Sequence, residues 1–141
     1  MYKVLIDSNI FVDFMFHREP FYKDSEKMIS LCENKKVKGY VTTSMLMDLH
    51  YIFRRLSYSN NTANKAIEEI IKVFDVLNIE KKDIVNSIMQ GKKDFEDGVI
   101  ENCSIANKLD CIVTRNIDDF DDKKIEVLSP KEIVEKYLKK D

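Results

Sequence analysis

Short apolar runs and longer amphipathic stretches alternate along almost the whole chain. The short runs are rich in β-branched residues, which favours strands, and we expect strands at residues 2–6, 40–43, 76–79, 111–114 and 125–128. In the longer stretches apolar residues recur at helical spacing. This spacing predicts helices at residues 10–16, 21–33, 45–56 (with Ser44 as the N-cap), 63–74, 82–89 and 94–108, and a final helix after a capping box at 129–132.

This alternation predicts one α/β domain over residues 1–141. A strand that is followed by a helix and then by another strand usually pairs in parallel, with the helices packed on the faces of the sheet. We therefore expect a three-layer sandwich with a mainly parallel central sheet and helices on both faces. In such sheets, binding sites form at the carboxyl edge of the strands, where each strand gives way to a helix.

Composition excludes several classes of protein. The three cysteines form no CxxC pair, and the three glycines leave no room for a glycine-rich phosphate loop. The N-terminus reaches a charged residue after a few apolar ones, and no apolar run approaches the ~20 residues that span a bilayer. We expect a soluble protein of the reducing cytoplasm, with neither a signal peptide nor a contact with the membrane.

The net charge of −2 hides an uneven distribution of charge. Between Asp94 and Asp122 there are nine acidic residues and two basic ones, a local charge of −7, which leaves +5 on the remainder. A solvated acidic surface and a cation site both explain such a segment. We expect four of these acids to be surface residues: Glu101, Asp110, Asp121 and Asp122.

Polar residues follow the predicted strands at the edge where a site is expected. Asp7 follows the first strand, Asp48 lies in the opening turns of the helix after the second, and Asp97 lies in the first turn of a later helix. Asn116 and Asp119 follow the fourth strand. Taken singly, each has an ordinary explanation as a turn former, a solvated helix residue or a partner of a helix dipole.

Carboxylates that converge on one edge repel each other, and a divalent cation removes that conflict. A set of oxygen ligands without a nearby His or Cys suits Mg²⁺ or Mn²⁺ better than Zn²⁺. Such an ion polarises a phosphate and activates a water molecule, so hydrolysis of a phosphodiester is the reaction that this site would support.

Four segments also resemble, in chain order, the acidic motifs of the PIN domain, and in particular those of the prokaryotic VapC toxins. They are DSNIFVD at 7–13, residues 44–49 around Asp48, DFEDGV at 94–99, and residues 113–120, which begin VTRN. The resemblance extends from the first strand to about Leu128. It implies a Mg²⁺- or Mn²⁺-dependent endoribonuclease that acts on RNA.

The resemblance also implies roles for individual residues. Asp7 would be the central metal ligand and Asp97 a second one, and Asp48 would take the place of the second family acid. Asn116 and Asp119 would close the site. Asn9 would orient Asp7, and Thr114 would hold a phosphate or a metal-bound water. Two positions depart from the family pattern, which usually has Glu in place of Asp48 and in many members Asp in place of Asn116. Asp119 or Asp94 can replace the missing charge, and the number of metal ions stays open.

An RNA substrate needs positive charge near the acidic site. The candidates are Arg54, Arg55, Arg18, Lys92, Lys93 and Arg115, each of which is also explained as a solvated surface residue. The resemblance further implies a small antitoxin as a partner and allows a homodimer. We would look for either contact at residues 10–16 and at Phe21 and Tyr22.

Two other functions stay open from the sequence. One is a non-catalytic PIN-like module that binds RNA or regulates, because Asp48 and Asn116 replace stronger ligands. The other is a phosphatase of the haloacid dehalogenase type, in which an Asp also follows the first strand. Asn9 weakens that second alternative, because the phosphatase reaction needs another Asp there.

Overall fold

The computed structural model describes residues 1–91, 94–121 and 123–138. Its strands are β1 (Lys3–Ile6), β2 (Lys38–Thr42), β3 (Asp75–Leu77), β4 (Cys111–Val113) and β5 (Glu126–Leu128). Its helices are α1 (Ser8–Met15), α2 (Tyr22–Glu33), α3 (Thr43–Ser57), α4 (Asn60–Val73), α5 (Lys81–Gln90), α6 (Phe95–Ala106) and α7 (Pro130–Leu138), with a 3₁₀ turn η1 at Ile117–Asp119. The predicted elements are all present, and η1 is an addition to them. None of the described helices is long and apolar enough to cross a membrane.

The five strands form one parallel sheet in the order β3-β2-β1-β4-β5. The chain starts in the middle strand, builds outward through β2 to β3, and then crosses to the other side of β1 to add β4 and β5. The direction of building therefore reverses between β1 and β4. Ligands of open α/β sheets bind at such a reversal, outside the carboxyl ends of the strands.

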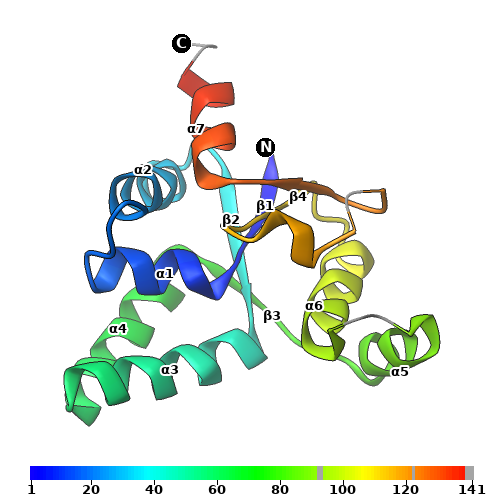
Figure 1. Ribbon diagram of the computed structural model, residues 1–141, viewed down its shortest axis with the longest axis horizontal. Helices are drawn as coiled ribbons and strands as arrows, with labels where there is room; N and C mark the ends of the chain where they lie inside the picture. Colours follow the sequence, from blue (N-terminus) through cyan, green and yellow to red (C-terminus); the bar gives the residue numbers. More distant parts are fainter. Residues whose placement is uncertain (92–93, 122, 139–141) are drawn as a thin grey trace.

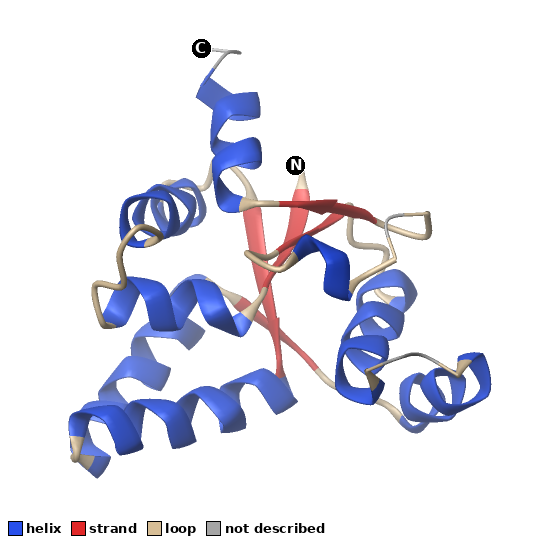
Figure 2. Cartoon of the chain, in the orientation of Figure 1, coloured by secondary structure: helices blue, strands red, loops and turns tan. Residues whose placement is uncertain are grey.

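Helices cover both faces of the sheet and make the predicted three-layer sandwich (Figures 1 and 2). Because side chains of a strand alternate between its faces, Val4 and Ile6 of β1 join a core with α1, α2, α3, α4 and α7, whereas Leu5 joins a second core with Ile100 of α6. Figure 1 shows α5 and α6 on one side of the strands and α1, α2 and α4 on the other.

Two helix starts illustrate how local sequence sets the elements. At α7 the predicted capping box is confirmed, since the Ser129 and Glu132 backbone amides each donate to the other's side chain at 3.1 Å. The predicted N-cap of α3 is wrong by two residues. Thr42, not Ser44, accepts the Met45 amide, at 3.2 Å, because the last strand residue keeps the extended backbone that an N-cap needs.

The second strand begins at Lys38, two residues earlier than the predicted start at residue 40, and therefore includes Gly39. The missing side chain is required by packing. A Cβ atom at Gly39 would lie 2.5 Å from Cδ1 of Phe74 and 2.8 Å from Sγ of Cys32. Gly39 therefore allows α2 and the segment after α4 to pack directly on the backbone of β2.

Candidate active site

Asp7 lies at the carboxyl end of β1, in the middle of the sheet, and is the N-cap of α1. Its Oδ1 accepts the amide of Ser8 at 2.8 Å. The backbone of Asp7 is still part of the sheet, because its N–H donates to the carbonyl of Val113 at 2.9 Å. The carboxylate is thus held at the point where the direction of sheet building reverses.

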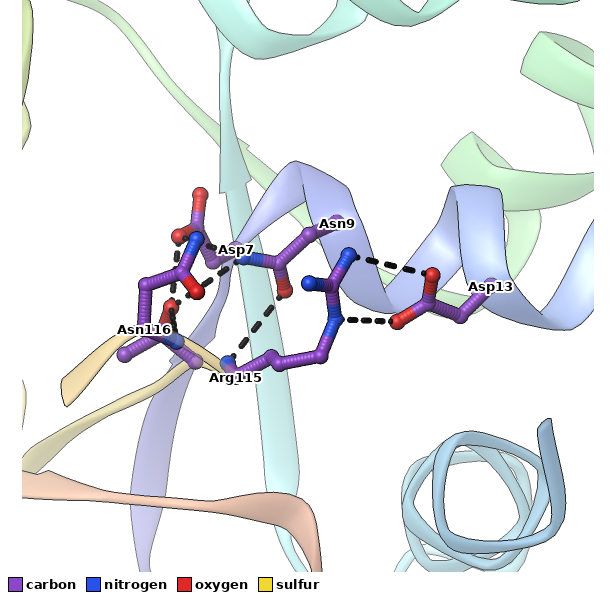
Figure 3. Close-up of polar contacts among 6 residues, drawn as sticks. Asp7, Asn9, Asp13, Arg115 and Asn116 are labelled. Atoms are coloured by element: carbon purple, nitrogen blue, oxygen red, sulfur yellow. Dashed lines mark hydrogen bonds and ion pairs between the residues drawn. The ribbon is translucent and has the colours of Figure 1, made fainter. Parts of the chain in front are cut away.

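A buried hydroxyl next to Asp7 organises the carboxylate (Figure 3). Thr114, fully buried after β4, donates from Oγ1 to Oδ2 of Asp7 at 2.7 Å. The same Oγ1 accepts Nδ2 of Asn9 at 3.3 Å and the backbone N–H of Asn116 at 3.1 Å. Asn9 also donates to Oδ2 of Asp7, at 3.3 Å. Because these donors face its carboxylate, Asp7 points in one defined direction.

Arg115 links this network to a buried acid that the sequence did not single out. Its backbone N–H donates to Oδ1 of Asn9 at 3.4 Å, and its guanidinium binds both carboxylate oxygens of Asp13. The guanidinium carbon also lies 4.3 Å from the ring centroid of Phe21. Figure 3 shows Arg115 reaching past Asn9 to Asp13 on α1. Asp13 follows an apolar run, but nothing local to the sequence indicates its distant partner.

Burial and nearby acids raise the pKa of both Asp7 and Asp97. For Asp7, burial is the largest cause, and the hydrogen bonds from Thr114 and Ser8 act against it by lowering the pKa. For Asp97, burial and then the nearby charges of Asp94, Asp7, Asp119 and Glu101 raise the pKa to about 7. Asp94 is the N-cap of α6 and accepts the Asp97 amide at 3.0 Å. Asp7 and Asp97 thus belong to one electrostatic cluster at the carboxyl edge.

Asp48 lies on α3 and contacts a residue that sequence reasoning missed. A hydrogen bond between Asp48 and Glu96, followed by burial and by the charges of Asp48, Asp94 and Asp97, raises the pKa of Glu96 to about 7. The first turns of α3 and α6 approach each other beyond the sheet (Figure 1). From the sequence, Glu96 is only a favourable residue in the first turn of a helix, and no local signal shows that α3 lies opposite.

The prediction that Glu101 is a surface residue is wrong. Glu101 is 1 % exposed and accepts the backbone N–H of Asp121 at 3.1 Å. It lies four residues after Asp97 on α6, hence on the same side of the helix, and this spacing was an available signal. Asp110 is exposed as expected, Asp121 is half-buried, and Asp122 lies outside the described residues.

The remaining candidates come from the segment after β4, from α3 and from the segment before α6. Asp119 is exposed in η1, and its amide donates to the carbonyl of Asn116, which is also exposed, at 3.1 Å. Arg54 and Arg55 are exposed near the end of α3, with each guanidinium carbon 5.8 Å from the centroid of the Tyr51 ring. Lys92 and Lys93 lie outside the described residues.

The donor set fits a hard divalent cation. Asp7, Asp97, Asp94 and Asp119 offer oxygen ligands, and their mutual repulsion is the conflict that a cation would relieve. Within the described part of the chain, no three acidic, His or Cys side chains already converge tightly enough to enclose an ion. Mg²⁺ is commonly held by one or two carboxylates while it keeps several water molecules, and that mode needs no closed cage.

Comparisons with known proteins agree with this fold. The chain matches the PIN domain family over residues 3–118. No curated protein matches it significantly. One similar solved structure is a protein of Pyrobaculum aerophilum, with a TM-score of 0.67 and 12% identity over 98% of this chain and 90% of that chain. Another is a toxin–antitoxin complex from Klebsiella pneumoniae, with a TM-score of 0.67 and 18% identity over 90% of this chain and 97% of that chain. A third is VapC20 of Mycobacterium tuberculosis, described as a toxin that cleaves the sarcin–ricin loop, with a TM-score of 0.61 and 11% identity over 88% of this chain and 98% of that chain.

Proposed function

The chain belongs to the PIN domain family, and on that premise we propose that it is a metal-dependent endoribonuclease, the toxin of a toxin–antitoxin pair. The observation that carries this proposal is the cluster of carboxylates at the carboxyl edge, where burial together with the neighbouring acids raises the pKa of Asp97 to about 7. A group of acids that repel each other in this way is suited to hold a cation. The toxin neighbours support the same conclusion.

In this proposal Asp7 and Asp97 hold Mg²⁺ or Mn²⁺, with Asp94, Asp119 and Asp48 in support. The bound ion would polarise the phosphodiester and supply an activated water. The protein's own part is to orient and to position. Thr114 and Asn9 fix the Asp7 carboxylate, Asn116 closes the site from the segment where its backbone N–H donates to Thr114, and cationic side chains nearby attract the RNA backbone.

Cleavage of single-stranded RNA by the purified protein tests the proposal. We expect products with Mn²⁺ or Mg²⁺ and none with EDTA, and we expect Asp7→Asn and Asp97→Asn each to abolish cleavage in a folded protein. Asp24→Asn, in the first turn of α2, is the matched control and should keep full activity. RNA retention without products at any metal concentration would identify a non-catalytic binding module instead. Release of phosphate from small monoesters would indicate the phosphatase, an alternative that the family match does not support.

An antitoxin needs a surface to bind, and an apolar cavity between α1, α2 and α4 offers one. It has a volume of about 460 Å³ and is lined by Phe14, Met15, Ile29, Ala66 and Ile70, among others. Met15 is 39 % exposed, although the rest of the predicted contact region at residues 10–16 is mostly buried. We propose that an apolar helix of a small antitoxin inserts there, because such grooves accept the apolar face of a helix.

Co-purification with the product of a short neighbouring reading frame tests this partner. Met15→Glu places a charge in the cavity and should prevent complex formation. Met47→Glu, at a residue of α3 that is 71 % exposed and does not line the cavity, should leave the complex intact. Equal loss in both variants would exclude the cavity as the binding surface. A homodimer stays a prediction that the mass of the protein in solution decides.

A further inference from the structure

A second cavity adjoins the acidic cluster and has the opposite charge. Its volume is about 420 Å³, and its lining includes Ser8, Asn9, Arg18, Tyr51, Arg55 and Arg115. We call it the basic pocket. Ser8 and Asn9 are hydrogen-bonded to Asp7, so the pocket opens beside the carboxylate that the proposed function places at the centre of the site. None of its lining residues is acidic.

The three guanidinium groups of the basic pocket are not equivalent. The charge of Arg115 is balanced by the buried carboxylate of Asp13, with Nε 2.7 Å from Oδ2. Arg18 and Arg55 are exposed, and neither forms an ion pair with any residue that the structure describes. Within the described part of the chain, two positive charges thus border the cavity without an ion-pair partner, which favours an anionic ligand.

Tyr51 gives the pocket an aromatic surface with a fixed orientation. Its hydroxyl accepts Nη1 of Arg55 at 3.1 Å, and the residue is 51 % exposed. The apolar side chains Val12 and Ile52 complete the lining. An exposed aromatic ring beside arginines is the combination on which bases of single-stranded nucleic acids stack while their phosphates are neutralised. A carboxylate ligand would use the arginines but not the ring.

One helix joins the two regions of opposite charge. Asp48, Tyr51 and Arg55 are spaced i, i+3 and i+7 on α3, so they lie on one side of the helix. The distance from Asp48 to Arg55 along the axis is about 10 Å. A single strand whose phosphate lies at the acidic cluster can therefore reach the basic pocket along this side of α3.

We propose that the basic pocket binds one nucleotide of the RNA substrate next to the scissile phosphate. Arg18 and Arg55 bind its phosphate, and its base stacks on Tyr51. This inference rests on the proposed function, which supplies the scissile phosphate at the neighbouring carboxylates. The volume is within the range of small-ligand sites, roughly 300–1,000 Å³.

Binding in EDTA tests the pocket apart from cleavage. We would measure the anisotropy of a fluorescent single-stranded RNA of about eight nucleotides, within the site sizes of single-strand binders. Tyr51→Leu keeps an apolar side chain but loses the stacking surface, and it should weaken binding about 5- to 100-fold. Tyr58→Leu is the matched control: Tyr58 directly follows α3, is 93 % exposed and lies outside the pocket, so this variant should bind as the wild type does.

The arginines and the base are tested in the same assay. Arg18→Gln and Arg55→Gln should each reduce the slope of log affinity against log salt by about 0.7, the single-strand value for one phosphate contact, whereas Lys27→Gln should leave it unchanged. An RNA that lacks one base at the bound position should bind the wild type more weakly than the intact RNA does. The Tyr51→Leu variant should bind both RNAs equally. This non-additivity assigns the stacking to Tyr51.

The outcomes separate the pocket from the proposed function. If the wild type cleaves RNA but Tyr51→Leu has unchanged affinity and unchanged KM, the pocket is excluded while the function stands. If no RNA is cleaved but binding depends on Tyr51, the function fails and the pocket stands. Binding of an acidic peptide as tight as that of RNA, and insensitive to Tyr51→Leu, would assign the pocket to a protein partner and overturn the inference.

Discussion

The guanidinium of Arg115 forms two contacts with the carboxylate of Asp13, Nε to Oδ2 at 2.7 Å and Nη2 to Oδ1 at 3.2 Å. The two side chains differ in exposure, 28 % for Arg115 and 1 % for Asp13. Planar two-point pairing of this kind fixes geometry as well as charge. Through its backbone N–H, Arg115 also holds Asn9, so the pair supports the orientation of the Asp7 carboxylate.

The difference in exposure predicts an asymmetric loss of stability. Arg115→Gln leaves the buried Asp13 charge without its cation and should lower the free energy of unfolding by about 3–5 kcal/mol. Asp13→Asn leaves an arginine that can turn toward water, and it should cost less, about 1–3 kcal/mol. Urea unfolding of both variants measures this, and a larger loss in Asp13→Asn would contradict the prediction.

Thr114 is expected to act through Asp7. Thr114→Val removes the hydroxyl that donates to Asp7 and accepts from Asn9 and Asn116, and should reduce stability by about 1–3 kcal/mol. Mn²⁺ affinity, measured by calorimetry, should fall about 10- to 100-fold because the ligand loses its orientation. Thr114→Ser keeps the hydroxyl and should stay near the wild type in both measurements. A loss in Thr114→Ser as large as that in Thr114→Val would show that the effect is not specific to the hydroxyl.

The raised pKa of Asp97 predicts how stability depends on pH in the metal-free protein. Burial and the charges of Asp94, Asp7, Asp119 and Glu101 raise this pKa from 3.8 to about 7. The folded state therefore binds a proton that the unfolded state has released, so the contribution of Asp97 to stability falls as pH rises between these two values. Asp97→Asn should raise the melting temperature in EDTA near roughly pH 8 and have little effect near roughly pH 4. An equal gain at both pH values would contradict this cause.

The contact between Asp48 and Glu96 predicts a coupled titration. Asp48→Asn removes the neighbouring charge and supplies an amide donor, so the pKa of Glu96 should fall from about 7 toward its ordinary value of 4.5. Carbon-13 NMR titration of the metal-free protein measures this directly. Asp75→Asn is the control. It removes an exposed carboxylate of β3 that pairs with Lys38 of β2, and it should leave the titration of Glu96 unchanged.

Any side chain at Gly39 is expected to destabilise the fold. Gly39→Ala places a methyl group against Phe74 and Cys32 and should cost about 1–3 kcal/mol of unfolding free energy. Combining it with Phe74→Leu, which removes part of the ring, should cost less than the sum of the two single changes. Strict additivity of the two would show that the clash lies elsewhere.

The elements of this fold were predictable from the sequence because their signals are local. Apolar periodicity identified every strand and helix apart from η1, and the capping box at Ser129 and Glu132 fixed the start of α7. Errors occurred where a distant neighbour decides. Gly39 belongs to a strand because it pairs with Val4 of β1, and Glu101 is buried where it accepts the Asp121 backbone N–H.

The candidate site divides in the same way. By itself, the sequence determined that Asp7 and Asn116 follow strands, and hence that they belong at the carboxyl edge of a parallel sheet, since that position depends only on the order of elements. It also placed Asp97 in the first turn of a helix, but that helix follows another helix, so its position at the same edge came from the tertiary structure. Only the tertiary structure decided which side chains come together: Asp48 forms a hydrogen bond with Glu96, Arg115 pairs with Asp13, and Arg18 and Tyr51 line one pocket. Those pairs are set by how helices from distant parts of the chain pack against one sheet, and this packing depends on contacts that no local pattern encodes.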